Sequence, residues 1–276
     1  INVQTSLDLL GDMEMYDETL GEFLDMTDDK ISALETHLQA NDMPNYAIDI
    51  HALKSDSKYL GLMKLAEIAY SHELKSKEIK LDAIVNIAGV HLMASLVETD
   101  PLKMKKLLDI NLFGTMLVNR VLYECLAEKG KIVILSSEVA SYDPLPFNGL
   151  YNISKTALEA YAQALRQELN LFDQKVISIR PGSIETPLSK GSITGTEELV
   201  NNTKLYKKQS KHFLHLVTKF MGRPLQPSKL AKKMYKIINK KHPKYIYTIH
   251  PSIGLVLLNI LPKKIQCAII KMLLNK

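Results

Sequence analysis

Apolar residues recur at intervals of three and four along residues 1–78, the spacing of one buried face on each of several α-helices. One face of a long helix would carry six of them: Leu20, Phe23, Leu24, Ile31, Leu34 and Leu38. Asn41 and Asp42 would end this helix, and Pro44 suits the first turn of the next. A further helix is expected at about residues 62–74. Together these elements predict a small antiparallel helical bundle.

From residue 79 onward, short and nearly continuous apolar runs alternate with longer helical segments. The runs are typical of strands buried on both faces and cover residues 81–87, 131–136, 176–179 and 245–249. Helices are expected over residues 101–126 and 150–171. Strands separated by long helices indicate a parallel sheet with right-handed crossovers. We predict an α/β fold for residues 79–276, a partial Rossmann-like doubly wound parallel sheet with helices on both faces, preceded by the small all-α bundle.

The charge of the chain changes sign near the same point. Residues 1–78 hold 6 basic and 16 acidic side chains, whereas residues 79–276 hold 29 basic and 14 acidic ones. Such asymmetry indicates two domains, 1–78 and 79–276, with different partners. No acidic side chain follows Glu198, and 17 lysines and arginines do.

The basic C-terminal tail carries short apolar blocks flanked by lysines. Such a tail suits peripheral contact with an anionic membrane, and packing of a C-terminal helix on the sheet or on a second copy of the chain is the equal alternative. The lysines are not interleaved with exposed aromatics or arginines, which argues against nucleic acid as a partner.

Composition excludes several other classes of protein. An apolar content of 46% and a charged content of 24% argue against disorder, collagen and a disulfide scaffold. No uninterrupted apolar stretch approaches the roughly 18 residues of a membrane-spanning helix. Cys125 and Cys267 match neither a redox pair nor a zinc-ligand spacing, so we expect no metal site and a reducing, cytoplasmic setting.

The second helix of the leader carries a candidate phosphoryl site. His51, Lys54, Ser55 and Lys58 are spaced so that they share one helix face. A neutral imidazole is a competent nucleophile toward a phosphoryl donor, and Lys54 and Lys58 would balance the added charge. The alternative is a solvated helix face that bears one incidental histidine.

The run from His51 to Gly61 resembles the phospho-accepting helix of histidine phosphotransfer domains, and the likeness covers most of residues 3–77. The resemblance implies His51 as the phosphoacceptor and Lys54 as its charge partner, in phosphorelay with a response regulator or a histidine kinase. Such domains end in a further helix, whereas the pattern here changes after about Lys77, so the leader resembles a truncated domain.

In the second segment, polar residues cluster at the expected strand ends, where parallel sheets bind ligands. Ser136 and Ser137 close the second strand, and Tyr151 and Lys155 share one helix face. The ammonium of a lysine would lower the pKa of the phenol from about 10, which would make it usable as an acid or base near neutrality. A serine can hold a substrate carbonyl, and the side chain of Asn111 can anchor a water that passes protons to Lys155. A Tyr and a Lys four apart are common, so the pair alone means little.

Five short motifs follow one another at residues 86–89, 111–114, 136–137, 151–155 and 181–186. Their order and residue types resemble those of the short-chain dehydrogenase/reductase family over essentially all of residues 79–276. The first motif has Ile87 in place of the family's second asparagine.

The resemblance implies reversible hydride transfer between NAD or NADP and a small-molecule alcohol or ketone. It implies Tyr151 as the acid/base, Ser137 as the substrate-oxygen anchor and Asn111 in a proton relay, with Lys155 both binding the ribose and lowering the tyrosine pKa. The interval before Tyr151 is one residue longer than usual, so Ser136 stays open as the anchor. The implied cofactor-binding residues are Asn86, Ala88, Gly89, Tyr151, Lys155, Pro181, Gly182, Ile184 and Thr186.

The family's first strand and glycine-rich turn have no counterpart in the sequence. Only Gly11, Gly21 and Gly61 precede Gly89, so no phosphate-binding turn is evident. The strand at residues 81–87 is then expected at an edge of the sheet. Three explanations stay open: an artificial or erroneous joining of two families, a natural fusion that has lost hydride transfer, or a leader that supplies the cofactor contact.

Overall fold

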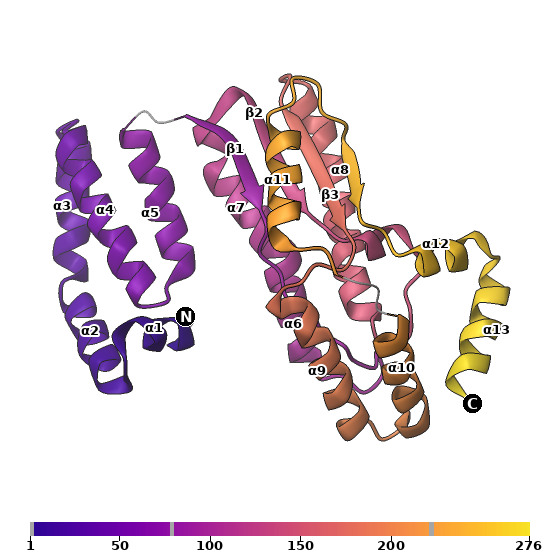
Figure 1. Ribbon diagram of the computed structural model, residues 1–276. Coiled ribbons are helices and arrows are strands. Elements are labelled where there is room, and N and C mark those ends of the chain that lie inside the picture. Colours follow the sequence, from indigo (N-terminus) through magenta and orange to yellow (C-terminus); the bar gives the residue numbers. More distant parts are fainter. Residues whose placement is uncertain (1–2, 78–79, 221–223) are drawn as a thin grey trace. The chain divides into compact units, whose positions relative to one another are not determined.

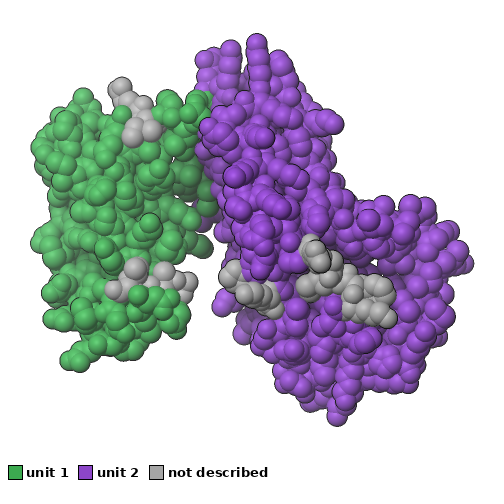
Figure 2. All heavy atoms as spheres, viewed as in Figure 1, with its two compact units in different colours: residues 1–82, 118–127 green, residues 83–117, 128–276 purple. Residues whose placement is uncertain are grey.

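The computed structural model describes residues 3–77, 80–220 and 224–276. The chain divides into two compact units, of which unit 1 comprises residues 1–82 and 118–127, and unit 2 comprises residues 83–117 and 128–276 (Figure 2). The units do not coincide with the expected division after residue 78, because residues 118–127 belong with the leader. Domains at 1–78 and 79–276 therefore stay a proposal.

Unit 1 consists mainly of helices (Figure 1). They are α1 (Val3–Leu10), α2 (Met13–Asp25), α3 (Thr27–Gln39), α4 (Met43–Tyr59) and α5 (Met63–Ser76). The helix that follows Pro44 and the helix after residue 62 occur as predicted. The single long helix was wrong: α2 ends at Met26, whose backbone N–H donates to the Glu22 carbonyl at 3.1 Å. Asp28 and Asp29 then favour a new helix start, because carboxylates stabilise the positive end of the helix dipole.

The core of unit 1 forms two small apolar clusters. Tyr16, Phe23 and Leu60 make the first, and Tyr46, Ile50 and Ala69 make the second. On α5, the backbone carbonyl of Ser71 accepts a hydrogen bond from Cys125 at 3.5 Å. Cys125 lies in the short helix η2 (Tyr123–Cys125) and is buried. The segment 118–127 therefore completes the packing of α5.

Most of the parallel sheet belongs to unit 2, and its strands have the order β1-β2-β3-β4. The strands are β1 (Leu81–Asn86), β2 (Leu126–Leu135), β3 (Lys175–Pro181) and β4 (Ile246–Ile249). The β2–β3 and β3–β4 pairs are parallel, with Ile134 opposite Ser178 and Arg180 opposite Thr248. This arrangement confirms the predicted α/β class and places β1 at an edge. The strand β2 begins five residues before the predicted start at Lys131.

Helices cover both faces of β3, whose side chains alternate between the faces. On one face, Ile177 and Ile179 pack with Leu230 and Met234 of α11 (Pro227–Ile238). On the other face, Ser178 accepts a hydrogen bond at 3.3 Å from Arg166 of α8 (Gly149–Asn170). The helices from residue 101 onward are α6 (Pro101–Leu108), α7 (Gly114–Leu122), α8 (Gly149–Asn170), α9 (Pro187–Asn202), α10 (Lys207–Phe220), α11 (Pro227–Ile238), α12 (Ile253–Ile260) and α13 (Lys263–Leu274), with the short helices η1 (Asp109–Phe113), η2 and η3 (Glu138–Ser141). Within the described ranges, none of the helices has both the length and the apolar character needed to cross a bilayer.

Candidate active site at the strand ends of unit 2

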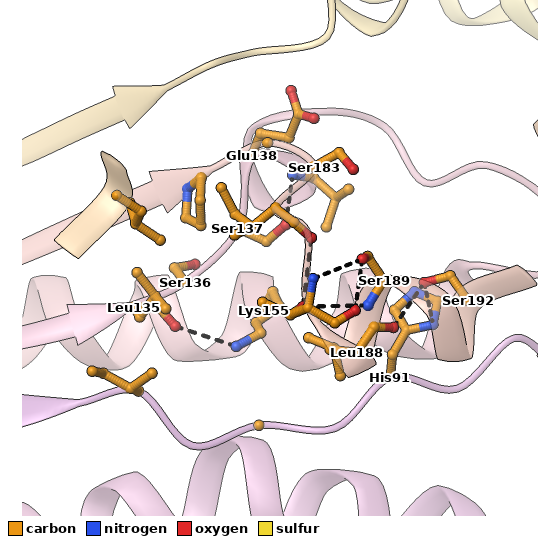
Figure 3. A pocket seen from close by; sticks show the side chains of 18 of the residues that line it. His91, Leu135, Ser136, Ser137, Glu138, Lys155, Ser183, Leu188, Ser189 and Ser192 are labelled. Atoms are coloured by element: carbon orange, nitrogen blue, oxygen red, sulfur yellow. Dashed lines mark hydrogen bonds between the residues drawn. The ribbon is translucent and has the colours of Figure 1, made fainter. Parts of the chain in front are cut away.

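A cavity of about 650 Å³ opens where β1, β2 and β3 end (Figure 3). We call it the reactive cavity. Nine of the predicted site residues line it: Ala88, Gly89, Ser137, Tyr151, Lys155, Pro181, Gly182, Ile184 and Thr186. Two further predicted residues, Asn86 and Asn111, do not line the cavity.

Asn86 and Asn111 are buried behind the cavity instead. The side-chain oxygen of Asn111 accepts from the Val90 N–H at 2.7 Å, and its amide donates to the Val90 carbonyl at 2.9 Å and to Ser154 at 3.0 Å. Both amide hydrogens are therefore engaged within the protein, and the role of this side chain in a proton relay stays a prediction. Asn86 donates to the Val133 carbonyl at 3.5 Å and so ties β1 to β2. Asn111 also lies in the π-helical turn η1, a feature frequent at functional sites.

Tyr151 and Lys155 lie in the first turns of α8, and both are buried. The Lys155 ammonium donates to the carbonyl of Leu135, the last residue of β2, at 3.3 Å, and Figure 3 shows this bond. Its nitrogen lies 5.8 Å from the centre of the Tyr151 ring. The Lys155 side chain thus passes the Tyr151 ring and ends at the last residue of β2.

The expectation that Lys155 lowers the tyrosine pKa was wrong. Burial raises the pKa of Tyr151 to about 12, against the opposing effect of a hydrogen bond with Ser137. Burial also lowers the pKa of Lys155 to about 8, against the attraction of Glu159. In the buried site, both side chains are shifted toward their neutral forms because desolvation penalises charge. The phenol is therefore protonated at neutral pH.

The two serines that end β2 differ in their contacts. Ser137 forms a hydrogen bond with Tyr151, and its hydroxyl accepts from the Val139 N–H at 3.4 Å. Ser136 also lines the cavity, but its hydroxyl is buried and has no hydrogen-bond partner among the described residues. The contact with the phenol favours Ser137 as the group closest to the acid/base residue.

Two glycines allow close approach at the cavity wall. A Cβ at Gly182 would lie 2.0 Å from the His250 carbonyl oxygen, so no other residue fits without a backbone shift. A Cβ at Gly89 would lie 3.3 Å from both the Asn111 side-chain oxygen and the Lys155 nitrogen. These contacts explain why glycine occurs at both motifs.

His91 was missed by the sequence reasoning. Its ring centre lies 4.3 Å from that of Tyr151, its Nε2 is 3.0 Å from the Asn148 side-chain oxygen, and its Nδ1 is 3.4 Å from the Ser192 hydroxyl. Burial lowers the pKa of His91 to about 4, with a hydrogen bond to Asn148 opposing and Lys155 assisting. The imidazole is therefore neutral at physiological pH. A lone histidine two residues after Gly89 carries no spacing signal that would have revealed this contact.

Glu138 is a second residue that was missed. This residue lines the reactive cavity, and its carboxylate accepts a hydrogen bond from the Ser252 N–H at 2.6 Å. Burial raises its pKa, partly offset by this bond and by His250. No motif or spacing distinguishes Glu138 from other acidic residues near a strand end.

In unit 1, the predicted pair His51 and Lys54 shares one helix face, as expected. A third residue, Glu73 of α5, binds both: its carboxylate lies 2.8 Å from His51 Nδ1 and 2.6 Å from Lys54 Nζ. Lys77 also contacts Glu73 at 2.6 Å. A carboxylate in this position would repel a phosphoryl group, and it had no role in the sequence-based hypothesis.

Comparison with known proteins covers a large part of the chain. The family model described as short chain dehydrogenase matches residues 25–197. The NADPH-dependent 1-acyldihydroxyacetone phosphate reductase of Schizosaccharomyces pombe is 36% identical over 128 residues, which are 46% of this chain and 43% of that protein. The 3-ketodihydrosphingosine reductase of Bacteroides thetaiotaomicron is 25% identical over 183 residues, 66% of this chain and 67% of that protein.

A short-chain dehydrogenase of Streptomyces avermitilis has a similar fold, with a TM-score of 0.53 at 16% identity over 75% of this chain and 74% of that chain. The chain thus spans 43% of the yeast reductase and about two thirds of the bacterial one. None of these matches supports the phosphotransfer resemblance of the leader, so phosphorelay through His51 stays a prediction. Because the family model covers more than half of the residues, this chain belongs to the short chain dehydrogenase family.

Proposed function

We propose that the chain is a reductase or dehydrogenase that transfers hydride between a nicotinamide dinucleotide, NAD or NADP, and an alcohol or ketone. The observation that carries the proposal is the meeting of Ser137, Tyr151 and Lys155 in one cavity, with the phenol protonated at neutral pH. A buried acid beside a hydroxyl donor is the arrangement that carbonyl reduction needs.

The residues present fit the nicotinamide end of the cofactor. Lys155 and Thr186, which line the reactive cavity, offer polar groups for the ribose. The bound dinucleotide supplies the hydride, which the protein cannot. Because no glycine-rich turn precedes Gly89, the fit extends to this end alone.

The protein's own residues handle the carbonyl oxygen of the substrate. Ser137 donates a hydrogen bond to that oxygen, and Tyr151 donates its proton as negative charge develops there. The neutral His91 ring packs against the phenol and, through its bond to Asn148, fixes the wall beside it. In the direction of oxidation, the same phenol must first lose its proton, which a pKa of about 12 disfavours near neutrality.

The relatives indicate the kind of substrate. The yeast protein is named as a reductase of 1-acyldihydroxyacetone phosphate, and the bacterial one as a reductase of 3-ketodihydrosphingosine. Both names denote keto compounds, so a small-molecule ketone is the substrate class that we assign to the reactive cavity.

The test is calorimetric titration of the full chain with NADPH and NADH, followed by ketone-dependent loss of the reduced cofactor's absorbance. We expect binding of at least one cofactor, and we expect Tyr151→Phe to lower kcat about 10²–10⁴-fold while leaving cofactor binding intact. Tyr235→Phe, on an exposed face of α11, is the matched control and should retain full activity. A folded chain that binds neither dinucleotide would overturn the proposal.

A further inference from the structure

A second cavity, of about 490 Å³, lies between α10, α12 and α13 of unit 2. Its volume falls within the range of about 300–1,000 Å³ that is typical of small-molecule sites. Six of its apolar side chains come from the three helices: Leu216 and Val217, Leu255 and Leu258, and Ile270 and Leu273. Among the described residues that line it, Ser252 is the only polar side chain. A ligand of this cavity must therefore be hydrocarbon along most of its length.

The second cavity shares a wall with the reactive cavity. Leu145 and Pro146 line the second cavity, while Asn148 lines the reactive one. Phe147, between them, is buried and packs edge-on against Phe213 at 5.4 Å. Ser252, which lines the second cavity, also connects the two cavities, because its N–H donates to the carboxylate of Glu138, a residue that lines the reactive cavity.

The helices α10, α12 and α13 that line the second cavity together hold seven lysines and no acidic side chain. The 78 residues after Glu198 hold 17 lysines and arginines and no acidic side chain. At the end of α13, Lys208 donates to the Asn275 carbonyl at 3.2 Å, and Lys271 follows the lining residue Ile270 in the sequence of α13. A ligand with an apolar chain and an anionic head complements such a site.

The helix α12 is apolar both where it lines the second cavity and where it is exposed. Leu255 and Leu258 face the cavity, whereas Ile253, Leu257 and Ile260 are exposed. A helix that is apolar on both its inner and outer faces is typical of contact with hydrocarbon.

We propose that the second cavity binds one long hydrocarbon chain of an anionic amphiphile, either a free fatty acid or a single-chain phospholipid. This binding goes beyond hydride transfer, and its test reads binding instead of turnover, so its failure and that of the proposed function are distinguishable.

The experiment titrates the full chain with saturated fatty acids of increasing length, each below its critical micelle concentration, by calorimetry. Affinity should rise about fourfold per methylene, the factor that corresponds to about 0.8 kcal/mol, and then level off when the cavity is full. A rise without a plateau would indicate partitioning onto an open surface and would overturn the proposal.

Two substitutions on α12 separate the cavity from the surface. Leu258→Trp fills the cavity and should weaken palmitic acid binding at least tenfold, whereas Leu257→Trp, on the exposed face, should change it less than twofold. Thermal unfolding checks that both variants fold, and Ile270→Phe on α13 replaces Leu258→Trp if that variant does not. Equal losses at positions 257 and 258 would overturn the proposal.

The two sources of the chain are told apart by a parallel titration with palmitoyl lysophosphatidylglycerol. A Leu258-dependent plateau with either probe supports the cavity as a chain-binding site, and the tighter of the two identifies the head group that it accepts. Absence of a Leu258-dependent signal with both probes would overturn the proposal.

Discussion

The ionisable side chains around Glu73 in unit 1 and those in the reactive cavity of unit 2 respond differently to burial. In unit 1, the Glu73 carboxylate is surrounded by His51, Lys54 and Lys77, all within 2.8 Å. In the reactive cavity of unit 2, Lys155 has a backbone carbonyl as its hydrogen-bond partner. Charges that are paired remain charged, whereas a buried group without a counter-ion is driven toward its neutral form.

The pKa values express this difference. Burial raises the Glu73 pKa, but hydrogen bonds from Lys54, Lys77 and His51 outweigh it and hold the value at about 2. In the reactive cavity, burial dominates and shifts the pKa values of Tyr151, Lys155 and His91 to about 12, 8 and 4, respectively. Strongly shifted pKa values cluster at functional sites, so these three values favour the reactive cavity as the place of proton transfer.

The largest expected change in stability comes from replacing Lys155, a buried charged side chain of the reactive cavity. Below pH 8, Lys155 is charged in both folded and unfolded chains, and the folded chain carries the desolvation cost of that charge. Between pH 8 and 10.5, the folded chain releases a proton that the unfolded chain keeps, so stability of the parent rises with pH there. Lys155→Met removes the cost, so it should raise the free energy of unfolding by up to about 3 kcal/mol at pH 7.

Denaturant unfolding of the parent and Lys155→Met across pH 7–11 measures this effect. The gap between the two proteins should narrow as the pH rises through the window. Lys131→Met, at a lysine that donates to the Ile238 carbonyl elsewhere in the unit, is the control and should show no such narrowing. A gap that stays constant with pH would contradict the buried-charge explanation.

Next in size is the effect of steric crowding at the cavity wall. Gly182→Ala places a Cβ 2.0 Å from the His250 carbonyl oxygen, a backbone atom that cannot rotate away. We expect a loss of about 2–3 kcal/mol of stability, because overpacking forces the backbone to shift. Denaturant unfolding measures it, with Gly195→Ala as the control, where the nearest contact is an ordinary 3.6 Å. Equal losses at both positions would refute the crowding argument.

A smaller change in stability is expected from replacing Glu73, which is paired with His51, Lys54 and Lys77. Glu73→Gln removes a charge that three basic groups bind, so we expect a loss of about 1.5 kcal/mol at neutral pH. Because the folded pKa is lowered from 4.5 to about 2, this stabilisation is fully present above pH 4.5 and is lost as the pH falls toward 2. Unfolding measured from pH 7 down to 2 should therefore show the parent converging on the variant. Divergence at low pH would contradict the assignment.

The smallest expected effect is a gain in unit 1. Gly21 lies within α2, and a Cβ there would meet nothing within 4 Å. Gly21→Ala should stabilise the helix by about 0.8 kcal/mol, because alanine loses less backbone entropy on folding. Hydrogen exchange of the α2 amides measures it locally. Slower exchange in α2 alone is the expected outcome, and faster exchange would show that the glycine has a packing role.

The sequence allowed much of the sheet and of the reactive cavity to be anticipated, since apolar runs and polar strand ends are local features. Nine predicted site residues do meet at one cavity. Features that depend on distant contacts were not predictable. The break at Met26, the inward turn of the Asn111 amide toward Val90, and the contact of His91 with Tyr151 each depend on residues far apart in the chain or on competition between capping groups.

The sign of the tyrosine pKa shift illustrates the same limit. Sequence spacing placed Lys155 and Tyr151 on one helix face, and charge proximity suggested a lowered value. The depth of burial, which decides the sign, is a property of the whole fold and has no local signature.

The bond between Cys125 and the Ser71 carbonyl has a practical consequence for dissecting the chain into fragments. A fragment that ends at residue 82 would contain all five leader helices and lack the segment 118–127 that packs on α5. Such a fragment would expose an apolar surface to solvent and should be less soluble than the parent chain. Recombinant work on the leader should therefore append residues 118–127 through a flexible linker instead of cutting at the point where the charge changes sign.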